Sequence, residues 1–264
     1  MENSRTTEAE DTPIPRAAPT RTLEKGLFLL GCFDAEHPEW TLKELRERAG
    51  LPKATTRRLM KTLESGNWVS YDAESGTYHL GTSALRVAYA ATSQNELVRV
   101  AHPYLLRLAE ETTESARLTV WTDGGAMIVD SVSTSRLFKY RAFKGMLLEG
   151  LAAANTKALV AFFPEETWDA LLARPIKPRT SKTVTDPEQI REQWREIRKA
   201  GIAYDWGEWN TEAPAVAAPV LGPGGQVLAS VSVVVPIERA TEEAMQRVGD
   251  AVKRTAADIS ARLS

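Results

Sequence analysis

The sequence predicts an α+β protein with a small helical N-terminal part and a larger part in which strands and helices alternate. Three observations support this fold class. Between residues 23 and 66, apolar residues recur at helical spacing in three short segments. Two strand-like runs then flank a turn-rich connection between residues 68 and 80. Beyond residue 96, apolar runs typical of strands alternate with amphipathic segments, which indicates a sheet covered by helices.

Composition narrows the class of protein. A chain of 264 residues favours two domains. Its 43% hydrophobic and 26% charged residues are ordinary for a globular protein. The formal net charge of −2 excludes a protein that binds polyanions over its whole surface. The single cysteine, Cys32, excludes an internal disulfide and a four-thiolate zinc site. No run of 18 apolar residues is present, so we expect no membrane span.

The first 20 residues contain three prolines and several charges but few large apolar side chains. Such a segment buries too little surface to offset the entropy of ordering it, so we expect a disordered tail over residues 1–20. It also lacks the apolar core of a secretory signal. We therefore expect a cytoplasmic protein.

Three helices are expected before residue 67, the first from Leu23 to Phe33. Thr41 is followed three residues later by Glu44, the spacing of a capping box that opens a helix. Gly50 stands where a helix end favours a residue that tolerates positive φ. Pro52 suits the first turn of the third helix, which therefore follows the second after a tight turn.

The third helix divides into two faces. Thr56, Leu59, Met60 and Leu63 fall at the i, i+3, i+4 and i+7 positions of an inward stripe. The opposite stripe is basic, and no acidic residue interrupts it: its members are Lys53, Arg57, Arg58 and Lys61. Residues 21–81 as a whole carry nine basic and nine acidic side chains, so the distribution of charge, and not its sum, points to DNA. The alternative is a solvated basic helix face.

Trp68–Tyr71 and Thr77–Leu80 are predicted strands around the turn at residues 72–76. A supporting helix, two helices joined by a tight turn and a hairpin together predict a winged helix-turn-helix. In that arrangement the third helix enters the major groove, where an arginine can pair bidentately with guanine.

The rest of the chain is predicted to alternate between strands and helices. Pro103 is expected to mark a break in a helix or the start of a new one. A hairpin is expected around Leu221–Gly225. The predicted helices are Ala84–Thr92, Leu97–Glu110, Asn155–Phe163, Glu165–Ala173, Pro187–Lys199 and Thr241–Leu263. The predicted strands are Arg117–Trp121, Ala126–Val132, Leu137–Phe143, Ala213–Val220 and Val227–Pro236.

Two groups of motifs stand out in the sequence. The first comprises LPKATTRRLMKTL at residues 51–63 and YHLG at 78–81; the second comprises GIAYD at 201–205 and VAAPV at 216–220. Together they resemble the IclR family of bacterial transcriptional regulators. The resemblance implies a winged helix-turn-helix joined by a linker helix to a GAF-like α/β effector-binding domain. It also implies a homodimer, or a dimer of dimers forming a homotetramer, on palindromic double-stranded operator DNA. The expected divisions are 1–20 tail, 21–81 DNA-binding domain, 82–95 linker helix, and 96–264 effector-binding and oligomerisation domain.

The resemblance and the basic stripe together nominate residues for DNA. Thr55 and Arg58 match the recognition-helix positions of the family, and the wing near Ser75 is expected at the neighbouring backbone. The complete predicted set is Lys53, Thr55, Thr56, Arg57, Arg58, Lys61 and Ser75.

The resemblance also nominates the residues that line an effector pocket: Leu148, Ala154, Asn155, Asp205, Ala215, Ser232 and Val234. Ala215 and Val234 stand where polar groups can occur in the family, so we expect a more apolar wall. Tyr140 and Arg141 are added from the strand pattern, with an ordinary amphipathic strand as the alternative. An arginine there could hold a carboxylate, so we hypothesise an apolar or aromatic organic acid as effector.

Other chemistry is disfavoured. The three histidines have no metal-ligand spacing, and no phosphate-binding or nucleophile motif occurs, so we predict no enzyme, no metal and no cofactor. One alternative is an enzyme in which Asp205 and Glu208 act as acid and base. Another is a winged helix that serves protein contacts. Among regulators we expect a repressor, controlled allosterically by the effector.

Overall fold

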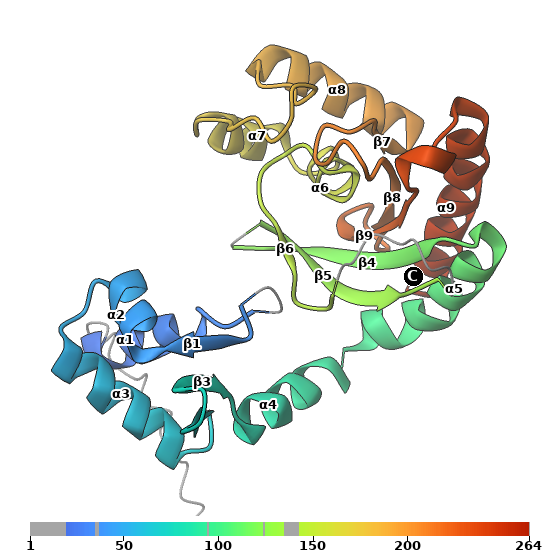
Figure 1. Ribbon diagram of the computed structural model, residues 1–264. Helices are drawn as coiled ribbons and strands as arrows, with labels where there is room; N and C mark the ends of the chain where they lie inside the picture. The colour runs from blue at the N-terminus through green and yellow to red at the C-terminus, as the bar shows by residue number, and fades with distance from the viewer. Residues whose placement is uncertain (1–19, 35–36, 94, 124, 135–142, 264) are drawn as a thin grey trace, which may run out of the picture. The chain divides into compact units, whose positions relative to one another are not determined.

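The computed structural model describes residues 20–34, 37–93, 95–123, 125–134 and 143–263 (Figure 1). The chain divides into two compact units, Met1–Val87 and Ala88–Ser264. The division falls within helix α4 (Thr82–Ser93), which occupies most of the predicted linker. The hypothesised strand Leu137–Phe143, with Tyr140 and Arg141, lies almost wholly outside the described residues.

The N-terminal unit is built from three helices and a small sheet, as the winged helix-turn-helix prediction requires. The helices are α1 (Arg21–Leu30), α2 (Leu42–Ala49) and α3 (Lys53–Ser65). The sheet has the order β1-β3-β2 and is antiparallel, with β1 (Glu39–Thr41), β2 (Val69–Asp72) and β3 (Thr77–Leu80). Strand β1 was not predicted, because a three-residue strand carries no recognisable alternation.

Local signals place α2 and α3. The Glu44 backbone N–H donates to the Thr41 hydroxyl, and the Glu44 carboxylate accepts from the Thr41 backbone N–H at 2.8 Å, so the predicted capping box is confirmed. Gly50 ends α2 with φ +62°, a left-handed conformation that disfavours other residues. The core beneath these helices includes the buried side chains of Leu29, Leu45 and Met60.

Helix α5 (Glu96–Thr112) runs without interruption through Pro103, so the predicted break there is wrong. A proline removes one backbone hydrogen bond, here the bond to the carbonyl of Arg99. Both Pro103 and Arg99 lie on the exposed side of the helix, where water can satisfy that carbonyl. The opposite side, with Ala101 and Leu105, is buried and holds the helix in place.

The C-terminal unit contains a six-stranded sheet of order β6-β5-β4-β9-β8-β7, in which all neighbours are antiparallel. Four strands are close to the predicted ones, and the two short edge strands were not predicted. Their bounds are β4 (Ser115–Thr122), β5 (Gly125–Val132), β6 (Leu147–Leu148), β7 (Ala203–Asp205), β8 (Ala215–Leu221) and β9 (Val227–Val234).

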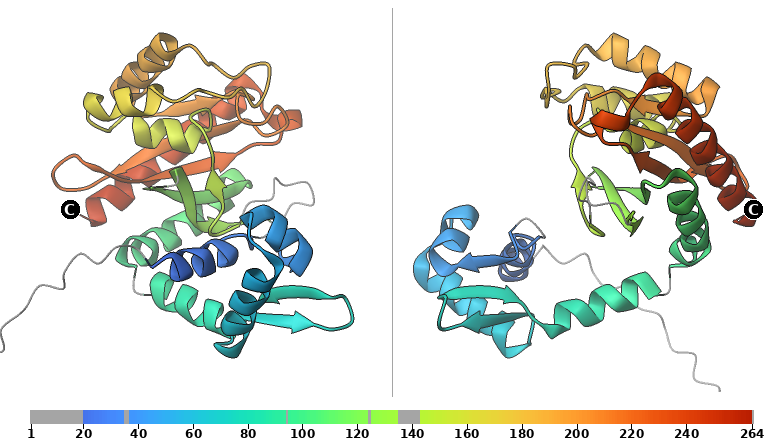
Figure 2. Two further views of the ribbon diagram at one scale, coloured as in Figure 1. Left: turned by 90° about the vertical axis from the view of Figure 1, so that its left-hand side faces the viewer. Right: turned by 45° about the vertical axis from the view of Figure 1, so that its right-hand side comes forward.

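Helices cover both faces of this sheet (Figures 1 and 2). Helices α5 and α9 (Glu242–Arg262) pack on one face. Helices α6 (Ala154–Val160), α7 (Glu165–Leu172) and α8 (Pro187–Ala200) lie over the other. Side chains of β8 alternate accordingly, with Val216 and Val220 toward the first face and Ala215 and Ala217 toward the second. A short 3-10 helix, Ile237–Arg239, leads into α9.

None of the helices in the described ranges combines the length and apolar character that crossing a membrane requires. Within the same ranges, no three histidine, cysteine, aspartate or glutamate side chains gather as a metal ion would need.

Candidate functional site

The exposed face of α3 carries four cations. Lys53, Arg57, Arg58 and Lys61 are all exposed, and none forms an ion pair with any residue that the structure describes. Thr55 lies half-buried beside them. Glu64, also exposed, follows them in the last turn of α3. A short helix whose first turns present exposed cations is suited to phosphate contacts, and its arginines can reach base edges.

Thr56 does not belong to this face, although it was predicted to contact DNA. Its side chain is completely buried, and its hydroxyl donates to the carbonyl oxygen of Pro52 at 3.2 Å. The prediction of a DNA contact at Thr56 is therefore wrong. Its inward position, which the apolar stripe also indicated, makes it a residue that holds the start of α3.

The turn between β2 and β3 is tightly hydrogen-bonded and exposed. The hydroxyls of Ser75 and Thr77 lie 2.6 Å apart, and Gly76 adopts φ +72°. The Glu74 backbone N–H donates to Asp72 at 2.8 Å, which holds the pKa of that carboxyl below its ordinary value. Because Asp72 and Glu74 are both acidic, this turn offers DNA only the Ser75 hydroxyl and backbone amides as favourable contacts.

In the C-terminal unit, six of the predicted effector residues line one small cavity between α6 and the sheet. They are Leu148, Ala154, Asn155, Asp205, Ala215 and Val234. The cavity, called here the inner cavity, is also lined by Arg117, Ala153, Trp209 and Ala213, and its volume is about 20 Å³. That is room for about one water molecule.

Asn155 connects α6 to the two central strands. Its side-chain amide donates to the hydroxyls of Thr119 on β4 and Ser232 on β9, each at 2.7 Å. The Ser230 hydroxyl in turn donates to the Asn155 carbonyl oxygen at 3.2 Å. Ser232 is thus one hydrogen bond behind the inner cavity and not part of its wall. Because these hydrogen bonds form one network, a change at the Asn155 side chain also affects the two strands that hold it.

Asp205 anchors the loop that follows β7. Its Oδ1 accepts from the backbone N–H groups of Gly207, Glu208 and Trp209 at 2.9, 2.6 and 3.3 Å. Burial raises the pKa of this carboxyl to about 6, against the opposing effect of those hydrogen bonds.

Next to this loop, the buried ammonium of Lys157 donates to the Glu208 carboxylate and to the Tyr204 carbonyl. Asp205 and Glu208 are therefore both engaged in holding backbone and a buried cation. This arrangement gives no support to the alternative in which they serve as an acid–base pair.

Arg117 was not predicted at the site, yet it is 97% buried and lines the inner cavity. It lies on β4 opposite Ser131 of β5 and Ser232 of β9. A cation within an otherwise apolar strand was the one signal in the sequence that could have pointed to this residue. Which face of the sheet it lies on follows only from the pairing of β4 with its neighbours. The inner cavity therefore carries both a guanidinium and the Asp205 carboxyl among apolar side chains.

Comparison with known proteins identifies the family. A model of the bacterial transcriptional regulator IclR C-terminal domain matches residues 89–261, and a model of the IclR helix-turn-helix domain matches residues 22–73. The chain belongs to the IclR family. The predicted family and fold are therefore confirmed, and this member is a transcriptional regulator with a DNA-binding helix-turn-helix and not an enzyme.

The relatives span nearly the whole chain. The transcriptional repressor IclR of Escherichia coli strain K12 is 28% identical over 249 residues, covering 93% of this chain and 91% of that protein. The crystal structure of an IclR transcriptional regulator from Alicyclobacillus acidocaldarius has a TM-score of 0.83 at 26% identity, with 94% and 100% covered. An IclR homologue from Microbacterium hydrocarbonoxydans, complexed with 4-hydroxybenzoate, has a TM-score of 0.80 at 22% identity, with 92% and 98% covered.

Proposed function

We propose that this IclR-family regulator is a repressor whose inner cavity binds a small organic acid, and that the acid changes its affinity for operator DNA. The observation that carries the proposal is that Asn155, Asp205 and Arg117 line one small cavity together with apolar side chains in the C-terminal unit. The guanidinium can pair with the carboxylate of a ligand, while the apolar wall accommodates its body.

The size of the inner cavity determines how such a ligand acts. Small-molecule pockets usually measure about 300–1,000 Å³, whereas this one measures about 20 Å³. In the described state the inner cavity is therefore too small for such a ligand, and an acid binds only by favouring a state in which the cavity is wider. A ligand shifts the equilibrium between two states by its difference in affinity for them. Coupling of about 1–3 kcal/mol changes operator affinity roughly 5- to 150-fold.

The ligand class follows from the lining. Leu148, Ala154 and Val234 supply apolar surface, and Arg117 supplies the cation that the hypothesis had assigned to Arg141. An aromatic acid meets both requirements. The Microbacterium protein, which is similar in fold to this chain, was crystallised with an acid of this class, 4-hydroxybenzoate.

On the DNA side, Lys53, Arg57, Arg58 and Lys61 are proposed to contact the operator, with Arg58 reading a base. Four exposed cations on 13 residues of helix support this role. Thr55 and Ser75 complete the proposed set. Phosphate contacts by these lysines and arginines would make the affinity strongly dependent on salt.

A homodimer is proposed on the evidence of α4. Leu85 and Tyr89 on this helix are 71% and 72% exposed, and Val87 is 54% exposed. Exposed apolar side chains on one helix favour a partner surface, and a second copy would place two recognition helices on a palindrome. Sedimentation equilibrium of the purified chain measures this directly.

The ligand proposal is tested by calorimetry with benzoate, 4-hydroxybenzoate, acetate, succinate and glucose. Wild type should bind the aromatic acids more tightly than the aliphatic acids or the sugar. Arg117→Met, which removes the charge and keeps an unbranched side chain, should weaken the aromatic acids roughly tenfold or more. Arg117→Lys should retain part of the affinity. Equal binding of benzoate by wild type and Arg117→Met contradicts the proposal.

A further inference from the structure

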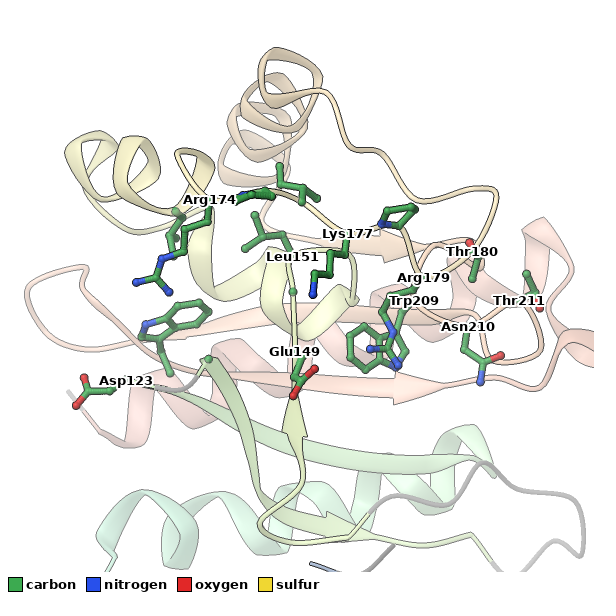
Figure 3. A pocket seen from close by; sticks show the side chains of 17 residues that line it. Asp123, Glu149, Leu151, Arg174, Lys177, Arg179, Thr180, Trp209, Asn210 and Thr211 are labelled. Carbon is green, nitrogen blue, oxygen red and sulfur yellow. The ribbon is translucent and has the colours of Figure 1, made fainter. Parts of the chain in front are cut away.

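One side chain, that of Trp209, lies between the inner cavity and a much larger one in the C-terminal unit. The larger cavity measures about 990 Å³ and is called here the outer cavity (Figure 3). Trp209 lines both cavities. It belongs to one apolar cluster with Leu148 and Ala153, which line the inner cavity, and with Trp121, which lines the outer one. The two cavities therefore adjoin, and the indole separates them.

Most of the inner wall cannot move without disturbing the sheet or α6. Seven of the ten residues that line the inner cavity lie on β4, β6, β7, β8, β9 or α6. Of the other three, Ala153 and Ala213 have only a methyl group to move. Trp209 lies on the loop between β7 and β8, and it alone among the ten also lines the outer cavity. Space for a ligand is therefore gained most easily by displacing this indole.

The backbone that carries Trp209 is fixed by hydrogen bonds. Asp205 accepts from the backbone N–H of Trp209 and from those of the two residues before it. The Thr183 hydroxyl donates to the Glu208 carbonyl oxygen at 2.7 Å. The Thr180 hydroxyl donates to the carbonyl oxygen of the preceding residue at 2.8 Å. We therefore expect the indole to move by rotation of its side chain, while the loop stays in place.

The indole itself is held by packing and by one cation–π contact. The guanidinium carbon of Arg179 lies 3.6 Å from the centre of the Trp209 ring. No hydrogen bond to another described residue holds the indole N–H of Trp209, whereas that of Trp168 donates to the Val160 carbonyl oxygen at 2.7 Å. Because Arg179 is exposed, its contact with the ring is of the weaker kind and can be broken when a ligand enters.

We propose that Trp209 determines which acids the inner cavity accepts: its indole turns into the outer cavity to make room for the ligand, and Arg179 opposes that movement. The proposal rests on the organic-acid site proposed above. The free energy of displacing the indole opposes the binding of every acid that needs the wider cavity, so the residues that hold the indole control affinity. Removing the indole joins the two cavities, so the protein should then accept longer acids.

Thiol labelling measures the displacement of the indole without any ligand. Ala215 lines the inner cavity and is 5% exposed. An Ala215→Cys variant in a Cys32→Ala background therefore places a single thiol there. Because a buried thiol is inert, iodoacetamide should react with it only when the inner cavity widens.

The labelling rate is then compared between variants of this parent protein. Trp209→Ala should raise it at least roughly tenfold. Arg179→Ala should raise it roughly 2- to 5-fold, the factor equivalent to an exposed cation–π contact. Arg174→Ala removes the same charge at the other end of the outer cavity (Figure 3), so it is the matched control and should leave the rate unchanged. No acceleration in Trp209→Ala, or equal acceleration in the two arginine variants, overturns the proposal.

Urea distinguishes a local movement from unfolding. Rotation of one side chain exposes little surface, so the labelling rate should not depend on urea below the unfolding transition. A rate that rises with urea from the lowest concentrations shows that labelling requires unfolding, and it contradicts the proposal.

Calorimetry with benzoate and biphenyl-4-carboxylate, which is longer by one ring, measures the consequence for ligands. Trp209→Ala should shift the preference toward the longer acid at least roughly tenfold relative to wild type, and an unchanged preference contradicts the role of Trp209. Failure of wild type to bind any acid would instead overturn the proposed function. Thiol labelling uses no acid, so it decides the role of Trp209 in either case.

Discussion

Asp205→Asn should stabilise the folded protein at neutral pH, although it replaces a buried carboxylate that accepts hydrogen bonds. The Asp205 side chain is 99% buried, and three backbone N–H groups donate to one of its oxygens. An asparagine can present its carbonyl oxygen to the same three donors. What the substitution removes is the unfavourable desolvation of a carboxylate, the cause that raises the pKa of this group from 3.8 to about 6.

The sign and size follow from that pKa. Because the folded state binds the Asp205 proton more tightly than the unfolded state, the group lowers stability as pH rises from 3.8 through about 6, and the loss is complete above that range. At about 1.4 kcal/mol per pH unit, the loss amounts to about 3 kcal/mol. Asp205→Asn should therefore match wild type near pH 4 and exceed it by about 1–3 kcal/mol at pH 8.

Urea unfolding followed by circular dichroism, at fixed protein concentration and at intervals from about pH 4 to about pH 8, measures this difference. Titrating groups that do not interact with Asp205 are common to both proteins, so they cancel when the two curves are subtracted. A difference curve for Asp205→Asn that is flat, or that shows the variant less stable at pH 8, refutes the reasoning.

Three further predictions concern DNA binding, the α2–α3 turn and assembly. Arg58→Ala should weaken the operator by about 1–3 kcal/mol with little effect on random DNA, whereas Lys61→Ala should weaken both alike and reduce the salt slope by about 1. Fluorescence anisotropy with the two DNAs decides this, and equal losses for Arg58→Ala contradict base reading. Gly50→Ala should destabilise by about 1 kcal/mol because of its left-handed backbone, while Gly26→Ala within α1, where an added Cβ meets no atom within 4 Å, should stabilise by a similar amount. Urea unfolding of the two variants should thus show opposite signs. Tyr89→Asp should shift sedimentation from dimer to monomer, and an unchanged dimer rules out α4 as its interface.

Local signals in the sequence were sufficient for the helices of the N-terminal unit, although not for its short strand β1. The capping box at Thr41 and the glycine at residue 50 act within one helical turn, so they determine where α2 begins and ends without help from tertiary structure. The prediction of a break at Pro103 failed because tertiary structure outweighed the local signal. Its local penalty is outweighed by the burial of Ala101 and Leu105 on the other side of α5, which depends on the sheet that the helix covers.

The site residues also divide into those that the sequence indicated and those that only the folded structure shows. The pocket-lining residues from Leu148 to Val234 were nominated by resemblance, and the fold brings six of them to one cavity. Arg117 was missed because nothing in an eight-residue strand says which face its one cation joins until β5 and β9 pair with it. Thr56 was assigned two incompatible roles, and burial decides between them.

The central claim is that occupation of the inner cavity changes operator affinity. Its most direct test is fluorescence anisotropy of labelled DNA from the region upstream of the protein's own gene, titrated with wild type and Arg117→Met, with and without saturating aromatic acid. The account predicts that both proteins bind this DNA without ligand, and that the acid changes the dissociation constant of wild type roughly 5- to 150-fold and that of the variant far less. An acid that binds wild type by calorimetry but leaves its DNA affinity unchanged would contradict the claim.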